Sequence, residues 1–141
     1  MKTQYTSLVK LKKDRLDMME RAVQSCHHTI FQIQQKIKTA TEELRAIALP
    51  QKGDFSLYRQ IQLLKQRVLD EISFNKHNLV AAESALIKAM QQLKTANIEY
   101  EKFMYLETTE IEKVLKAEKI KDAKELDEIA LMGFNKRKND A

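Results

Sequence analysis

The stretch LDMMERAVQSCHHTIFQIQQKIKTATEELRAI, residues 16–47, decides the fold class. Apolar or small side chains recur in it at spacings that alternate between three and four residues. They are Leu16, Met19, Val23, Cys26, Ile30, Ile33, Ile37, Ala40, Leu44 and Ile47. This alternation puts the side chains on one stripe of an α-helix, which is the pattern of a coiled-coil seam. The stretch therefore predicts a long helix that packs against another helix along this stripe.

The composition favours a few long helices. The 141 residues include only two glycines and one proline, whereas sheets and many-turned bundles need more turn residues. The net charge of +5 arises from interspersed acidic and basic residues, so binding to nucleic acid is permitted but not indicated. No apolar run approaches the roughly 18 residues of a membrane-spanning helix. A cytoplasmic protein is therefore expected.

A second seam runs from Leu57 to Phe103. Its positions are Leu57, Ile61, Leu64, Val68, Ile72, Asn75, Leu79, Ala82, Leu86, Ala89, Leu93, Ala96, Tyr100 and Phe103. The two successive four-residue steps from Leu64 to Ile72 predict a stutter that locally unwinds the supercoil. Asn75 is a polar seam position, and we expect it to fix the register of the two helices.

The two seams are joined at residues 49–54, which hold Pro50 and Gly53. Proline cannot continue a helix and glycine permits a tight reversal, so this segment predicts a short turn between antiparallel helices. The first helix is expected from about Thr3 to about Ala48. Asp54 or Ser56 is expected to cap the second helix.

The turn also predicts where the hairpin ends. A turn centred near residues 51–52 places Tyr5 opposite the region of Ile98, and the apolar seam is interrupted at Glu107. Both observations put the end of the hairpin near Phe103. The prediction is thus an all-α fold: a long antiparallel two-helix coiled-coil hairpin over residues 1–103, whose second helix extends past the first.

Residues 104–141 are predicted to form a helical C-terminal extension with a basic tail. The helical pattern continues to about Glu118. A separate short helix is expected from Asp122, a candidate N-cap, to Gly133, a candidate C-terminal stop. The basic run Lys136-Arg137-Lys138 follows it.

The sequence shows no catalytic or metal-binding constellation, so we expect no enzyme, no metal and no cofactor. His27 and His28 point about 100° apart on a helix, which is unsuitable for sharing a metal. Cys26, the only cysteine, lies on the seam and is expected to be a buried thiol.

Four of the nine aromatic residues form two pairs with different expected roles. Phe31 and Phe74 lie just off the seams and are expected to pack against each other across the hairpin. Phe55 and Tyr58, next to the turn, have less to pack against. They are better candidates for contact with a partner.

Two terminal motifs, together with the hairpin, carry a resemblance to a known family. The first is YTSLVKLKKDR, residues 5–15, followed by Glu20-Arg21-Ala22; the second is KELDEIA, residues 124–130, which precedes the basic tail. In length, layout and these motifs the chain resembles the FliJ family. That family is the small coiled-coil component of the bacterial flagellar protein-export apparatus.

The resemblance implies a non-catalytic stalk and chaperone-escort protein, cytoplasmic and peripheral to the membrane at the flagellar base. Its partners would be the hexameric export ATPase, the export-gate membrane protein and export chaperones, with no nucleic acid, and the chain is expected to be a monomer on its own. The implied ATPase-ring contacts at the open tip and tail are Lys10, Lys12, Lys13, Arg15, Lys124, Asp127, Glu128 and Ile129. The implied export-gate contacts, early in the second helix, are Tyr58, Ile61, Leu64, Lys65 and Val68.

Two other interpretations remain open from the residues alone. The chain could be a coiled-coil scaffold that dimerises in another pathway, because a single hairpin buries only one stripe of each helix. It could also bind nucleic acid through the basic cluster of residues 10–15, in which case binding would weaken steeply with salt.

Overall fold

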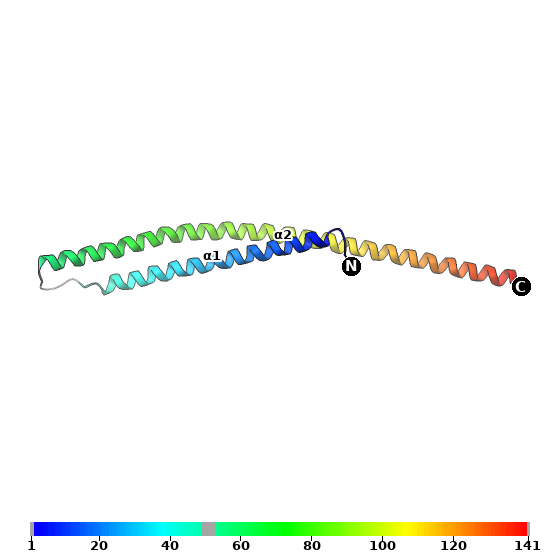
Figure 1. Ribbon diagram of the computed structural model, residues 1–141, viewed down its shortest axis with the longest axis horizontal. Helices are drawn as coiled ribbons and strands as arrows, with labels where there is room; N and C mark the ends of the chain where they lie inside the picture. Colours follow the sequence, from blue (N-terminus) through cyan, green and yellow to red (C-terminus); the bar gives the residue numbers. More distant parts are fainter. Residues whose placement is uncertain (1, 49–52, 141) are drawn as a thin grey trace. The chain divides into compact units, whose positions relative to one another are not determined.

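The computed structural model describes residues 2–48 and 53–140, with side chains up to Lys138. Helix α1 spans Thr6–Ala46 and helix α2 spans Phe55–Asp140 (Figure 1). No strand occurs in the described residues, and the two long helices pack together, so the predicted all-α hairpin is confirmed. Most of the predicted turn, residues 49–52, lies outside the described part of the chain.

Local hydrogen bonds begin each helix. The carbonyl of Tyr5 accepts from the N–H of Val9 at 2.8 Å, and the N–H of Thr3 donates to the Thr6 hydroxyl at 2.8 Å. Asp54 takes the N-cap position of α2, because its carbonyl accepts from the N–H of Tyr58 at 3.2 Å. These contacts satisfy backbone groups that a helix end leaves without intrahelical partners.

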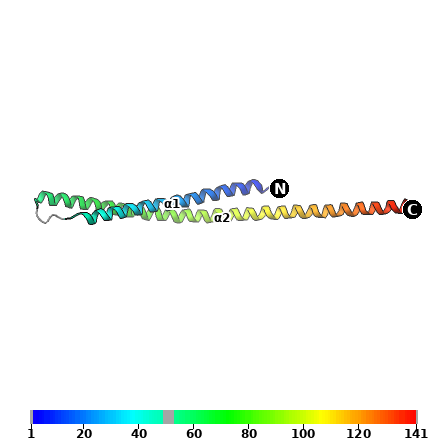
Figure 2. The ribbon, with the colours of Figure 1, turned by 90° about the horizontal axis from the view of Figure 1, so that it is seen from below.

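The chain divides into two compact units. The stem is Arg15–Ala96, and the terminal unit combines Met1–Asp14 with Asn97–Ala141. In the stem the two helices lie side by side and antiparallel, as both views show (Figures 1 and 2). The side chains that are less than 9 % exposed all belong to the stem; they are Leu16, Met19, Ala40, Val68, Asn75, Ala89 and Ala96.

The seam predicted on α1 is confirmed. Leu16, Met19 and Ala40 are buried, and the remaining predicted positions are half-buried. Burial therefore follows the alternating spacing of three and four residues along the whole helix.

The seam predicted on α2 is correct from Ile72 to Phe103, but the stutter before it is wrong. Leu64 is 48 % exposed, whereas its neighbour Lys65 is half-buried. Apart from Gln62, partial or full burial in this stretch falls on residues 61, 65, 68, 72 and 75, which keeps the regular alternation. Lysine can occupy such a position because its apolar stem packs while its ammonium group reaches water.

The same regularity continues at the other end of α2. The apolar pattern is interrupted at Glu107, but Glu107, Glu110 and Val114 are half-buried and keep the spacing of the seam. Leu106 and Ile111 beside them are half-buried as well, so the charged residues occupy seam positions within a wider half-buried stripe.

The predicted pairing of the helices is offset. Glu71 of α2 lies beside residues 35–43 of α1, because they line one groove of the stem together, and Ala40 is the buried residue of that stretch. Within the terminal unit, Thr6 contacts Glu107, whereas the prediction placed Tyr5 opposite Ile98. The paired stretch therefore continues past Phe103, where the sequence predicted its end.

The physical reason for the offset lies near the start of α2. Both helices rise equally per residue, so stepping along them from Ala40 and Glu71 brings Ala46, the end of α1, level with Lys65. The first turns of α2 consequently extend beyond α1. The sequence prediction assumed a compact turn at Pro50 and Gly53. It therefore paired each residue of α1 with a residue of α2 that lies several positions before its actual neighbour.

The C-terminal extension is helical, but it is a continuation of α2. The helix passes through Asp122 and Gly133 without a break and ends at Asp140. The predicted separate short helix is therefore wrong. Gly133 does not stop the helix, and no described glycine has a positive φ angle.

Candidate interaction surfaces

Lys12 connects the two helices of the terminal unit. Its Nζ atom lies 2.5 Å from Oε2 of Glu99 and 5.6 Å from the centroid of the Phe103 ring. Lys13 stands beside it, with Nζ 5.5 Å from the centroid of the Tyr100 ring. A carboxylate and two aromatic faces thus hold two adjacent ammonium groups through charge pairing and cation–π attraction. We call these five residues the lysine clamp.

A second polar contact fixes the start of α1. The Thr6 hydroxyl donates to Oε1 of Glu107 at 2.9 Å. This places the Glu107 carboxylate at the N-terminus of α1, where the partial positive charge of the helix dipole favours an anion. Glu107, which interrupts the apolar pattern, is therefore a contact residue.

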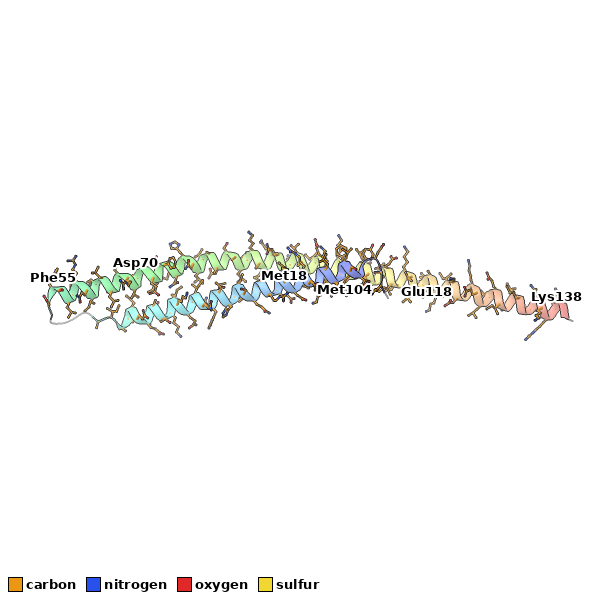
Figure 3. All side chains as sticks on the ribbon, in the orientation of Figure 1. Met18, Phe55, Asp70, Met104, Glu118 and Lys138 are labelled. Atoms are coloured by element: carbon orange, nitrogen blue, oxygen red, sulfur yellow. The ribbon has the colours of Figure 1, made fainter. Side chains whose placement is uncertain are left out.

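The tail of α2 is exposed along its whole described length. Every residue from 115 to 138 is exposed, and side chains extend from all sides of the helix between the labelled Glu118 and Lys138 (Figure 3). The exposed fractions of its large apolar side chains are 48 % for Leu115, 56 % for Ile120, 66 % for Leu126, 64 % for Ile129, 61 % for Leu131, 68 % for Met132 and 64 % for Phe134. At about 100° per residue these side chains are distributed around the helix, and exposed apolar side chains in such number make the tail a candidate surface for contact with another molecule.

The start of α2 forms a second exposed apolar surface. Because α1 ends level with Lys65, it does not cover the turns before that residue. The exposed fractions there are 76 % for Phe55, 45 % for Leu57, 44 % for Tyr58, 64 % for Leu63 and 48 % for Leu64. At about 100° per residue, Leu57 and Leu64 lie on one side of the helix and Phe55 and Tyr58 on another, so the exposed side chains are distributed around this end of α2.

Comparison with known proteins assigns the chain to a family. The family model described as "Flagellar FliJ protein" matches residues 1–139. The chain belongs to the FliJ family. It is accordingly a component of the flagellar export apparatus. The comparisons with curated proteins and with solved structures gave no match.

The residues implied as ATPase-ring contacts in this FliJ-family chain fall into two separate sets. Lys124, Asp127, Glu128 and Ile129 are all exposed on the tail. Lys10, Lys13 and Arg15 are exposed on α1, whereas Lys12 is half-buried in the lysine clamp. Lys12 and Lys13 are both members of the lysine clamp, so both have a structural contact that the sequence did not reveal. The structure does not bring the two sets together.

The residues implied as export-gate contacts differ in accessibility. Tyr58 and Leu64 are exposed, Ile61 and Lys65 are half-buried, and Val68 is only 5 % exposed. Val68 is a core residue of the stem and offers no free surface. Phe55, Leu57 and Leu63 are more accessible members of the same region, and the early end of α1 is the signal that identifies them.

Phe31 and Phe74 do not form the predicted contact in the core. Their exposed fractions are 58 % and 66 %. Each lies one position away from a half-buried or buried seam residue, Ile30 or Asn75, and this single step turns the ring outward. Their contact was predicted from a pairing centred near residues 51–52. With the offset pairing, the two residues no longer lie opposite each other.

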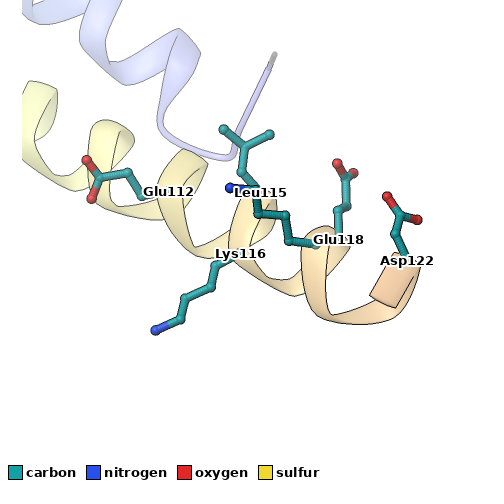
Figure 4. A pocket seen from close by; sticks show the side chains of 6 residues that line it. Glu112, Leu115, Lys116, Glu118 and Asp122 are labelled. Atoms are coloured by element: carbon teal, nitrogen blue, oxygen red, sulfur yellow. The ribbon is translucent and has the colours of Figure 1, made fainter. Parts of the chain in front are cut away.

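A hollow on α2 in the terminal unit lies among charged side chains. It is lined by Glu112, Leu115, Lys116, Glu118, Lys119 and Asp122. Leu115, Glu118 and Asp122 extend from the same side of the helix, and Lys116 extends from another (Figure 4). Among the described residues, no group of three His, Cys, Asp or Glu side chains is placed to hold a metal ion. The hollow therefore offers mixed charge around one apolar side chain, which suits a polypeptide contact.

The described part of the chain contains no helix that is both long enough and apolar enough to cross a membrane.

Proposed function

We propose that this chain is a non-catalytic stalk of the flagellar type III protein export apparatus. In this proposal it seats its terminal unit in the ring of the hexameric export ATPase, contacts the export-gate membrane protein and escorts export chaperones. It works in the cytoplasm, peripheral to the membrane at the flagellar base. The family match over residues 1–139 is the observation that carries this proposal.

The exposed tail supports contact with the ATPase ring. It presents a continuous helix with apolar side chains, among them Leu126 and Ile129, and with charges of both signs such as Lys124 and Asp127. A helix of this kind can place several anchors into a surrounding protein wall while its backbone hydrogen bonds remain satisfied. Lys10, Lys13 and Arg15 add exposed positive charge on α1.

The start of α2 supports contact with the export gate. Tyr58 and Leu64 lie within its exposed apolar surface, and Phe55 enlarges that surface. Aromatic and aliphatic side chains of this type are the usual energetic centre of a protein interface. This region lies in the stem, so its contacts can be altered by mutation without changing the tail.

The proposal is tested with the purified cognate export ATPase. Adding the full chain is expected to raise both ATP hydrolysis and the fraction of hexamer, and a chain that ends at Glu118 is expected to lose both effects. Cutting there keeps every half-buried residue of the described structure, so the helical content of the stem should remain normal. Stimulation by the truncated chain equal to that of the full chain would overturn the role of the tail.

A matched pair of substitutions refines this test. Ile129→Ser and Ile98→Ser each remove one exposed isoleucine, at 64 % and 56 % exposure. Only Ile129→Ser should weaken ATPase binding, by about tenfold, as expected for an interface anchor. Equal effects of the two substitutions would contradict a specific tail contact.

The gate contact is tested by capture of the chain on the isolated cytoplasmic domain of the export-gate protein. Tyr58→Ala is expected to weaken capture by about tenfold, which is typical of an exposed aromatic anchor. Leu11→Ala, at an exposed position in the terminal unit, is the control and should change capture little. Capture that depends on neither residue would contradict this part of the proposal.

A further inference from the structure

The first part of the chain is held to α2 differently from the stem. No residue in the ranges 2–14 and 97–138 is buried, whereas Leu16 and Met19, where the stem begins, are only 5 % and 8 % exposed. We call residues 2–14, which comprise the capping segment and the first turns of α1, the arm. The arm therefore depends on polar contacts and partial burial where the stem depends on buried apolar side chains.

Opposite charges are separated between the arm and the stretch of α2 beside it. Residues 2–13 contain four lysines and no acidic residue, whereas residues 97–112 contain five glutamates and one lysine. The two stretches consequently attract each other over their whole length. Because their side chains are exposed or half-buried, dissolved salt can screen this attraction.

The contacts between the arm and α2 occur at three levels. The ammonium group of Lys12 reaches the carboxylate of Glu99 near one end of the arm, and the Thr6 hydroxyl reaches Glu107 further along. Residues 2–4, which precede α1, line a hollow together with side chains of α2. The arm thus follows α2 from the edge of the stem to the beginning of the exposed tail.

Thr6 joins the cap of α1 to the contact with α2. Its hydroxyl oxygen accepts from the N–H of Thr3 at 2.8 Å, and the hydroxyl oxygen of Thr3 accepts from the N–H of Tyr5 at 3.1 Å, so the two threonines cap the helix reciprocally. The same Thr6 hydroxyl donates to Oε1 of Glu107 at 2.9 Å. Losing the contact with α2 therefore removes the group that orients the capping hydroxyl.

From these contacts we propose that the arm detaches from α2 and unwinds as one unit, released by salt, while the stem remains paired. Salt screens the attraction between exposed charges, but it does not screen the burial of apolar side chains that holds the stem. A helical stretch as short as the arm is marginal in water without packing against another helix, so detachment and unwinding occur together.

Release of the arm uncovers two aromatic side chains of α2. Tyr100 and Phe103 are half-buried while the ammonium groups of Lys13 and Lys12 lie over their rings. Both rings become accessible when the arm detaches. The proposed contacts with the export ATPase and the export gate do not require this change, and the tests below use the chain alone, so this inference and the proposed function can fail separately.

Amide hydrogen exchange of the full chain, measured at about 0.1 M and about 1 M sodium chloride, tests release by salt. Relative to an unstructured peptide in the same buffer, exchange of residues 9–14 should quicken at high salt by a common factor of at least about three. Residues 19–40 should exchange no faster. Exchange that slows steadily from residue 9 to residue 14 would indicate fraying of the helix end, and an absence of any salt effect would exclude charge attraction. Either result would overturn the proposal.

A matched pair of substitutions on α2 tests whether the arm opens as one unit. Glu107→Ala removes the acceptor of the Thr6 hydroxyl and alters no residue of the arm, and it should quicken exchange throughout residues 9–14 by about threefold to tenfold. Glu112→Ala removes the same charge from an exposed position of α2 and should quicken it less than about twofold. Equal effects of the two substitutions, or an effect of Glu107→Ala that leaves residues 12–14 unchanged, would overturn the proposal.

Discussion

The stem and the terminal unit continue the same seam with different chemistry. In the stem, buried Leu16, Met19 and Val68 exclude water from the line where the helices meet. In the terminal unit the same spacing brings Lys12 and Glu107 to that line, and none of its described residues is fully buried. Apolar burial provides most of the stability of packed helices, whereas partly exposed ion pairs provide little. One helical register can thus build a firm scaffold in one unit and a weakly held pairing in the other.

The largest expected effect separates the two units directly. Leu16→Ala should lower the free energy of unfolding by about 2–4 kcal/mol, because it removes buried apolar groups and leaves a cavity. Leu11→Ala, at a 60 % exposed position in the terminal unit, should change it by less than about 0.5 kcal/mol. Urea denaturation followed by circular dichroism measures both values, and equal losses would contradict the contrast.

Asn75 is the one polar residue among the buried side chains that the structure describes. Its side chain is 5 % exposed, and it occupies a seam position of α2, where the two helices pack together. Asn75→Leu should raise the free energy of unfolding by about 1–2 kcal/mol, because it removes a polar group from an apolar seam. If Asn75→Leu lowers the free energy of unfolding instead, the polar side chain of Asn75 stabilises the stem and the expectation is wrong.

A substitution at Gly133 tests how stable the helix of the tail is. A Cβ atom added there meets nothing within 4 Å, and the helix continues through this residue. Gly133→Ala should therefore stabilise the tail helix by about 0.5–1 kcal/mol, because alanine loses less backbone entropy than glycine. Slower amide hydrogen exchange around residue 133 would be the readout. Unchanged exchange there would mean that the tail is already fixed by other contacts.

Removing the charge of Lys12 from the lysine clamp is expected to change the free energy of unfolding least. Lys12→Met keeps the length of the side chain and removes the charge pair with Glu99, which is worth about 0.2–1 kcal/mol because both groups are partly exposed. Amide exchange of residues 6–13 should lose its dependence on salt in this variant. Exchange that depends on salt as strongly as in the unaltered chain would show that Lys12 does not control this pairing.

The contrast between the units also explains what the sequence could predict. The seam of α1 and the α2 seam from Ile72 to Phe103 were predictable, because apolar side chains record burial directly. Lys65 and Glu107 were not, since a charged residue in a seam resembles an interruption of it. The offset pairing was missed because turn residues such as Pro50 indicate that the chain reverses, but not how far α2 extends beyond α1.

The candidate surfaces were predictable to different degrees. The tail residues Lys124, Asp127, Glu128 and Ile129 came from the resemblance in a short motif; they are exposed, and their contact role stays a prediction. The exposed surface at the start of α2 depends on where α1 ends, which only the structure gives. Val68 shows the limit of carrying over a family's contact region, because this predicted export-gate contact is a core residue of the stem.

The central claim is that the stem is a scaffold and that contact with the export ATPase belongs to the tail. Amide hydrogen exchange of the full chain, with and without the export ATPase, tests it most directly. Alone, the stem seam should exchange slowest and residues 119–138 fastest, because exposed helix without tertiary packing opens most readily. With the ATPase, protection should rise in residues 119–138 and stay unchanged in residues 16–40. Protection gained in the stem and absent from the tail would contradict the account.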